Sequence, residues 1–143
     1  MEEDSIRLLR ECDAGVKMGV DSIEDTIDHA QDPELRDLLH RSRAHHLKLG
    51  REIEELLNEA HDDGKDPNPM ARGMSKLKTS MRLTFEPSDT AVANLITEGC
   101  DMGVRSLARY LNQYEGAEDT PRNIARRLID AEEELREGLR PFL

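Results

Sequence analysis

Apolar residues recur at intervals of three and four along most of the chain, which is the spacing of one face of an α-helix. Residues 4–30 carry the first of these apolar seams, in which Asp13 is the one polar member. The second seam runs over residues 35–60 and includes Ser42 and His46. Because no stretch alternates with a period of two residues, we expect no strand, and the pattern predicts an all-α protein.

Helix ends are marked by capping residues and prolines. Three sites combine a residue that caps a helix with a proline suited to the first helical turn. They are Asp32-Pro33, Asn68-Pro69 and Thr120-Pro121. The helix that begins at Pro69 should end near residue 84, before Pro87, and Ser88-Asp89 should begin a long helix that ends near Gly116.

These elements are predicted to form two helical hairpins joined by a long crossover. The hairpins cover residues 4–62 and 88–143, and the crossover over 63–87 contains the short helix. Short links at 31–32 and 117–120 force the two helices of each hairpin to run antiparallel. We therefore expect one domain over all 143 residues, an antiparallel four-helix bundle with a long crossover.

The two hairpins are similar in sequence. A shift of 88 residues places Cys12-Asp13-Ala14-Gly15-Val16-Lys17 on Cys100-Asp101-Met102-Gly103-Val104-Arg105, and Pro33 on Pro121. The matched proline begins the second helix of each predicted hairpin. A duplicated helical hairpin explains this agreement most simply.

Composition restricts the class of protein further. Hydrophobic residues make up 36% of the chain and aromatic residues only 3%, so the core must be aliphatic. The net charge of −11 disfavours nucleic acid as a partner, since a phosphate backbone would be repelled. No apolar run approaches the length of a membrane span, and the acidic N-terminus lacks the pattern of a signal peptide. We expect a cytoplasmic protein whose two cysteines are buried and reduced.

Several short stretches resemble one protein family. They are residues 11–17, 46–50, 68–70, 103–107, 110–114 and 139–143. Together they resemble the ferritin-like superfamily, and more closely a small bacterial family of ferritin-like bundles without an assigned function. The resemblance covers essentially the whole chain and implies a fold, but it does not imply an activity.

The resemblance raises the question of a metal centre. Functional members of the superfamily bind two metal ions with a Glu from each of two helices and Glu-x-x-His from each of the others. This chain contains no Glu-x-x-His, and Arg43 stands three residues before His46. The internal repeat places Glu134 opposite His46, while Asp13 and Asp101 lie at the positions of first ligands. An intact di-iron oxidase is therefore disfavoured.

Two interpretations of these polar positions stay open. In the first, Asp13, Ser42, His46 and Glu132 form a buried polar cluster in which His46 bonds to Asp13 or to a water. In the second, His46, Asp13, Glu134 and Asp101 hold a weaker metal site for iron, zinc or manganese.

Small residues form a narrow strip on two of the predicted helices. Cys12, Gly15 and Gly19 share one helix face, and Cys100 and Gly103 form the copy of this strip in the second hairpin. Each glycine inside a helix costs about 0.8–1 kcal/mol relative to alanine. We expect a close crossing of these two helices to offset that cost, or a strip that faces a second subunit or a ligand.

The crossover is the one basic segment. Residues 65–83 contain five cations and one acidic residue, and Met70, Met74, Leu77 and Met81 share one helix face. We expect this face to pack on the bundle while the cations pair with acidic helices. Alternatively, Met70, Met74, Lys76, Lys78 and Met81 form a docking face for a partner. Binding to an anionic membrane surface is disfavoured.

Two functions follow from these observations. The first is a non-enzymatic bundle that acts through contacts, as a homo-oligomer such as a dimer, and whose ancestral metal site is degraded. The second is a metal-binding or redox protein that uses His46 and nearby carboxylates. No nucleophile–base pair or phosphate-binding loop is evident in the sequence.

Overall fold

All regular secondary structure of the protein is helical, which confirms the predicted all-α class. The computed structural model describes residues 1–143 and contains five α-helices, two short 3₁₀ segments and no strand. The α-helices are α1 (Glu3–Thr26), α2 (Pro33–Glu59), α3 (Pro69–Phe85), α4 (Asp89–Gln113) and α5 (Asp119–Leu139). Segments Ile27–His29 and Arg140–Phe142 extend α1 and α5 as 3₁₀ turns. No helix combines the length and the apolar composition that crossing a bilayer requires.

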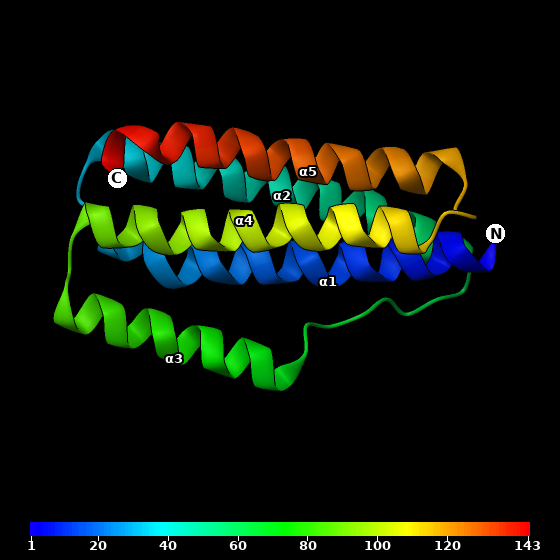
Figure 1. Ribbon diagram of the computed structural model, residues 1–143, viewed down its shortest axis with the longest axis horizontal. Helices are drawn as coiled ribbons and strands as arrows, with labels where there is room; N and C mark the ends of the chain where they lie inside the picture. The colour runs from blue at the N-terminus through cyan, green and yellow to red at the C-terminus, as the bar shows by residue number, and fades with distance from the viewer.

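Helices α1, α2, α4 and α5 lie side by side, and α3 lies outside them (Figure 1). The chain reverses direction between α1 and α2 and again between α4 and α5, so each pair forms a hairpin (Figure 1). Helix α1 also contacts α4, and α2 contacts α5, which closes the group of four. Helix α3 packs on α1 and α4, after an extended segment over residues 62–68.

Local capping explains where the helices begin. The Asp32 carboxylate accepts the N–H of Glu34 at 2.8 Å, and Asn68 accepts the N–H of Met70 at 2.9 Å, as predicted. The predicted Thr120 cap is wrong, because α5 already begins at Asp119. The hydroxyl of Ser5 on α1 accepts the N–H of Glu118 at 2.8 Å, and this contact anchors the start of α5.

The core is aliphatic and consists of two clusters that follow one another along the helices. The first cluster includes Leu49 and Leu128, and the second includes Leu39 and Leu135. Each of these leucines is buried, and burial of such a side chain contributes about 1.5–3 kcal/mol. On α2 and α5, the residues between the two clusters include His46 and Glu132. A polar layer therefore separates the two apolar clusters.

Candidate functional site

A histidine–carboxylate pair forms the centre of this polar layer. His46 of α2 is 1% exposed, and its Nε2 contacts Oε1 of Glu132 on α5. Its Nδ1 lies 2.8 Å from the carbonyl oxygen of Ser42, so Nδ1–H donates to that oxygen. When His46 is protonated, its Nε2–H donates to Oε1 of Glu132. The two side chains thus form a hydrogen-bonded pair in a buried environment.

The surroundings raise the pKa of His46 above its ordinary value of 6.5. Burial opposes the charged imidazolium, but the hydrogen bond and negative charge of Glu132, with the Ser42 carbonyl, outweigh that penalty. Folding therefore favours protonated His46. Because the folded pKa exceeds the unfolded one, the pair contributes its full stabilisation below about pH 6.5. That contribution is lost as the pH rises through the raised pKa of His46.

Helices α1 and α4 contribute small residues around the pair. A Cβ added at Gly19 of α1 would lie 3.0 Å from Cδ2 of His46, and one at Gly103 of α4 would lie 3.5 Å from Oε2 of Glu132. Burial, and then the neighbouring Glu132, raises the pKa of the Cys100 thiol on α4. Gly19 and Gly103 leave room for the buried pair, and all four long helices contribute to the site.

The strip of small residues does not have the predicted role at Gly15. A Cβ at Gly15 would meet no atom within 4 Å, so the predicted close helix crossing at this position is wrong. Cys12 and Cys100 are free and buried, and they belong to different apolar clusters. Burial raises the pKa of the Cys12 thiol to about 12, which keeps it protonated at neutral pH.

Alanine substitutions at Gly15 and Gly19 of α1 should have different effects on stability. Gly15→Ala should raise the free energy of unfolding by about 1 kcal/mol, because it gains helix propensity and meets no neighbour. Gly19→Ala gains the same propensity but presses on the His46 ring, so we expect it to be at least about 1 kcal/mol less stable than Gly15→Ala. Urea unfolding of the two variants measures the difference. Equal stabilisation would show that Gly19 does not accommodate His46.

The four residues predicted as metal ligands do not meet. Asp13 is bound to Lys17 and Lys65, and the exposed side chain of Asp101 pairs with Arg136 at 2.8 Å. Glu134 lines a shallow surface pocket between α2 and α5. No group of three or more His, Cys, Asp or Glu side chains has the geometry to hold a metal ion. The residues present do not fit the di-metal centre that the resemblance implies.

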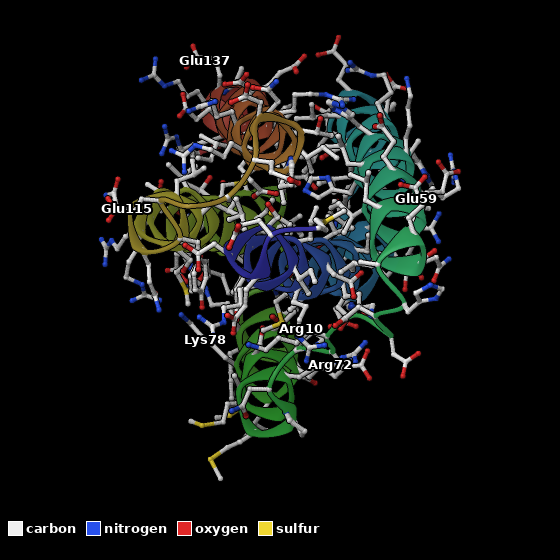
Figure 2. All side chains as sticks on the ribbon, turned by 90° about the vertical axis from the view of Figure 1, so that its right-hand side faces the viewer. Arg10, Glu59, Arg72, Lys78, Glu115 and Glu137 are labelled. Atoms are coloured by element: carbon white, nitrogen blue, oxygen red, sulfur yellow. The ribbon has the colours of Figure 1, made fainter.

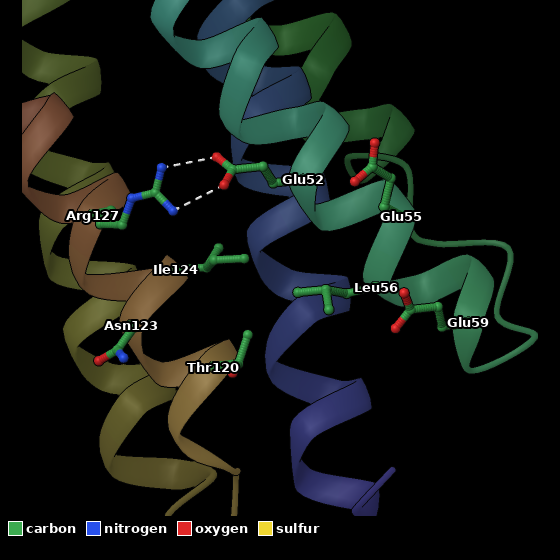
Figure 3. A pocket seen from close by; sticks show the side chains of 8 residues that line it. All are labelled: Glu52, Glu55, Leu56, Glu59, Thr120, Asn123, Ile124 and Arg127. Carbon is green, nitrogen blue, oxygen red and sulfur yellow. Dashed lines mark hydrogen bonds and ion pairs between the residues drawn. The ribbon is translucent and has the colours of Figure 1, made fainter.

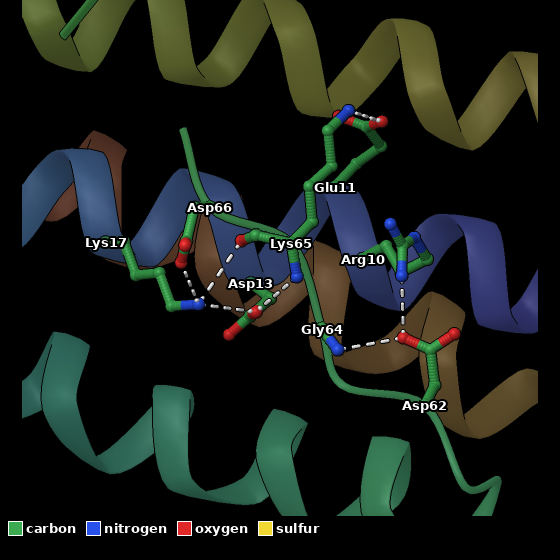
Figure 4. Close-up of polar contacts among 8 residues, drawn as sticks. All are labelled: Arg10, Glu11, Asp13, Lys17, Asp62, Gly64, Lys65 and Asp66. Carbon is green, nitrogen blue, oxygen red and sulfur yellow. Dashed lines mark hydrogen bonds and ion pairs between the residues drawn. The ribbon is translucent and has the colours of Figure 1, made fainter. Parts of the chain in front are cut away.

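Asp13 instead holds the segment after α2 against α1 (Figure 4). Its Oδ2 accepts the N–H of Lys65 at 2.9 Å and the ammonium of Lys17 at 3.0 Å. The prediction that His46 bonds to Asp13 is therefore wrong. Burial disfavours the charged Lys17, but its hydrogen bonds to Asp66 and Asp13 raise its pKa overall. We call this group of contacts the Asp13 clasp.

Two further ion pairs extend the Asp13 clasp along α1. Arg10 lies 2.8 Å from Asp62, which also accepts the N–H of Gly64 at 2.8 Å. Lys65 pairs with Glu11 at 2.5 Å. Four acidic residues and three cations therefore bind the extended segment to one face of α1 (Figure 4). The sequence signal for this contact is the cluster of charges over residues 62–66.

A shallow pocket between α2 and α5 was not predicted. Arg127 of α5 makes a bidentate contact with Glu52 of α2, at 3.1 and 2.8 Å, and this hydrogen bonding lowers the pKa of Glu52 (Figure 3). The other lining residues are Glu55, Leu56, Glu59, Thr120, Asn123 and Ile124. The pocket is open and acidic, and no buried polar atom points into it without a partner.

The apolar side of α3 faces away from the other helices. Five large apolar residues on this helix are more than half exposed: Met70, Met74, Leu77, Met81 and Phe85. We call them the α3 stripe. Figure 2 shows sulfur atoms projecting from α3 on the side remote from the other helices. The prediction that the methionine face packs on the bundle is wrong.

The cations of α3 explain this orientation. Lys76 and Lys78 pair with Asp25 of α1 and Glu98 of α4, at 3.0 and 2.7 Å. Arg72 pairs with Asp21 at 2.5 Å. The predicted pairing of the cations with acidic helices is thus confirmed, and it turns the polar side of α3 inward. The side chains of Lys76 and Lys78 stay 51% and 65% exposed while they make these pairs.

Comparison with known proteins shows a likeness of fold. The chain is similar to the crystal structure of a DUF305 fragment from Deinococcus radiodurans, with a TM-score of 0.75. The match covers 98% of this chain and 95% of that chain at 11% sequence identity, so it concerns the fold alone. No family model matches the sequence, and no curated protein matches it.

Proposed function

We propose that this protein is a non-enzymatic interaction protein and that the α3 stripe is its contact surface. The observation that carries the proposal is the continuous exposure of five large apolar side chains on one helix face. An apolar patch of this kind on a charged protein indicates a binding surface, because leaving it in water is unfavourable. The Asp13 clasp and the ion pairs of α3 hold this surface in place.

We further propose that the fold is a single-domain antiparallel four-helix bundle of the ferritin-like type, which arose by duplication of a helical hairpin. Support comes from the pairing of α1 with α2 and of α4 with α5, and from the burial of both Cys12 and Cys100. The two free thiols fit a reducing compartment, and we propose the cytoplasm as the location. The His46–Glu132 pair then occupies the place of a degraded metal site.

Methionine oxidation tests the proposed contact surface. Dilute peroxide is applied to cells that contain the protein and to the purified protein at high dilution, and sulfoxides are quantified by mass spectrometry. Met70, Met74 and Met81 should be protected in cells and reactive when dilute, while the exposed Met1 serves as the reference outside the stripe. Equal oxidation of the stripe in both conditions would contradict the proposal.

The alternative function, a metal-binding or redox protein, has one supporting observation. An imidazole and a carboxylate that suit iron, zinc or manganese meet in the polar layer. However, these are only two potential metal ligands, and they are already hydrogen-bonded to each other. Elemental analysis of protein purified without chelators tests this alternative. Near-stoichiometric metal that disappears in His46→Ala, but persists in His45→Ala, would favour it over the interaction protein.

A further inference from the structure

Helix α3 is amphipathic, but its polar face is turned toward the other helices and its apolar face toward solvent. A helix that covers a core has the opposite orientation. Ser75, Thr79 and Leu83 are at least partly buried on the side toward α1 and α4, and only the last of them is apolar. The α3 stripe lies on the other side and has no covering element within the chain. A surface helix normally turns its apolar face toward a partner. No element among residues 1–143 is therefore available to cover the stripe.

We infer that the occupant is a second copy of this chain, bound through α3 in an antiparallel, two-fold arrangement. This inference rests on the proposed function. Positions 70 and 85, and likewise 74 and 81, are symmetric about a point between Leu77 and Lys78. In an antiparallel pair, Met70 meets Phe85 of the partner subunit and Met74 meets Met81 of the partner subunit. Leu77 lies near the axis, so the surface is self-complementary, as a two-fold interface requires.

The charges on α3 favour a second copy over an acidic partner or a membrane. Each of its four cations already has an acidic partner within the chain, Arg82 with Glu86 at 2.9 Å included. No member of the stripe is charged, and Lys78, which lies next to the axis, is neutralised by its pair with Glu98 of the same chain. A net charge of −11 on the whole chain would in addition repel an anionic surface.

The exposed area is sufficient for a dimer of modest affinity. A fully exposed side chain of this size presents on the order of 200 Å², and the stripe residues are 53–82% exposed. Each copy therefore offers roughly 670 Å², and two copies bury at most roughly 1,300 Å², the lower end of stable interfaces. Gly73 flanks the stripe and has no neighbour within 4 Å of an added Cβ, which allows the two helices to approach closely.

Sedimentation velocity on the intact chain tests the inference. The wild type should form a dimer over concentrations from low micromolar to near millimolar. Leu77→Glu places two like charges near the axis and should weaken the dimer on the order of 100-fold or more. Leu143→Glu is the matched control, since Leu143 is 54% exposed at the C-terminus, outside the stripe, and it should leave the dimer intact. Circular dichroism should show the same helix content for all three proteins.

Disulfide trapping tests the direction of the two helices. Cys12 and Cys100 are buried, so introduced thiols should react first under mild oxidation. Leu77→Cys should give a covalent dimer. A mixture of Met70→Cys and Phe85→Cys should give the mixed dimer, whereas Met70→Cys alone should give none. A covalent dimer of Met70→Cys alone would overturn the antiparallel arrangement.

The possible outcomes separate this inference from the proposed function. A wild type that stays monomeric, or a Leu77→Glu variant that still dimerises through another surface, overturns the second copy as occupant. If the stripe methionines are then still protected in cells, the interaction function stands with a different partner. Co-sedimentation with anionic vesicles, lost in Leu77→Glu and weakened by salt, would identify a membrane instead. The dimer should strengthen with salt, because two copies of charge −11 repel each other.

Discussion

Glu132→Ala should lower the free energy of unfolding by about 3–5 kcal/mol at pH 6. The substitution leaves a buried imidazole without its partner and opens a cavity between α2 and α5. Chemical denaturation measures the loss, and Glu133→Ala on the exposed side of α5 is the control that should change stability little. A loss of under 1 kcal/mol would show that water or another group satisfies His46 when Glu132 is absent.

The effect of Glu132→Ala should depend on pH in a defined direction. The folded pKa of His46 is raised, so the stabilisation from the charged pair is complete below about pH 6.5. The difference between wild type and Glu132→Ala should therefore shrink as the pH rises from about 6 to about 9. A difference that does not change with pH would show that His46 does not titrate against Glu132.

Replacing both members of the pair should restore much of the lost stability. In His46→Leu with Glu132→Leu, no charge is left buried alone, and the two leucines join the apolar clusters on either side of the polar layer. We expect the double variant to be at least as stable as the wild type at pH 8. A double variant as unstable as Glu132→Ala would show that packing, and not charge, accounts for the loss.

Among the Gly→Ala substitutions, we expect Gly64→Ala to be the most destabilising, lowering the free energy of unfolding by about 3 kcal/mol. Gly64 has φ of +82°, a left-handed conformation that costs alanine about 1–2 kcal/mol. Its Cβ would also collide with Oδ2 of Asp13, so the Asp13 clasp must open. The free energy of unfolding from urea titration measures the effect.

Two further substitutions show which cause dominates at Gly64. Gly99→Ala lies in α4, meets no neighbour and should stabilise by about 1 kcal/mol, which makes it the matched control. Gly64→Asn accepts the left-handed backbone but carries the same Cβ. If the collision with Asp13 dominates, asparagine should be nearly as damaging as alanine. Wild-type stability in Gly64→Ala would show that the segment does not need this conformation.

Most of the helical framework could be predicted because helix formation depends on nearby residues. The seam over residues 4–30 and the Asp32 and Asn68 caps act within one or two turns, and the structure has helices at these places. The start of α5 was missed by two residues because Ser5, far away in the sequence, binds Glu118. The burial of Asp13 and His46 was also expected from their places in apolar seams.

The partners of those buried groups could not be predicted, since they depend on how neighbouring helices are rotated and aligned. His46 meets Glu132, one residue beyond the apolar seam of α5, while Asp13 meets a backbone N–H that follows α2. The same holds for α3, whose methionines share a face in the sequence but whose outward direction results from ion pairs with Asp21, Asp25 and Glu98. Periodicity and capping are local properties of the chain, so its order of residues defines the helices and the residues that share each face. Which faces meet and which stay in water is settled by contacts between distant segments, because burial and pairing energies are summed over the whole fold.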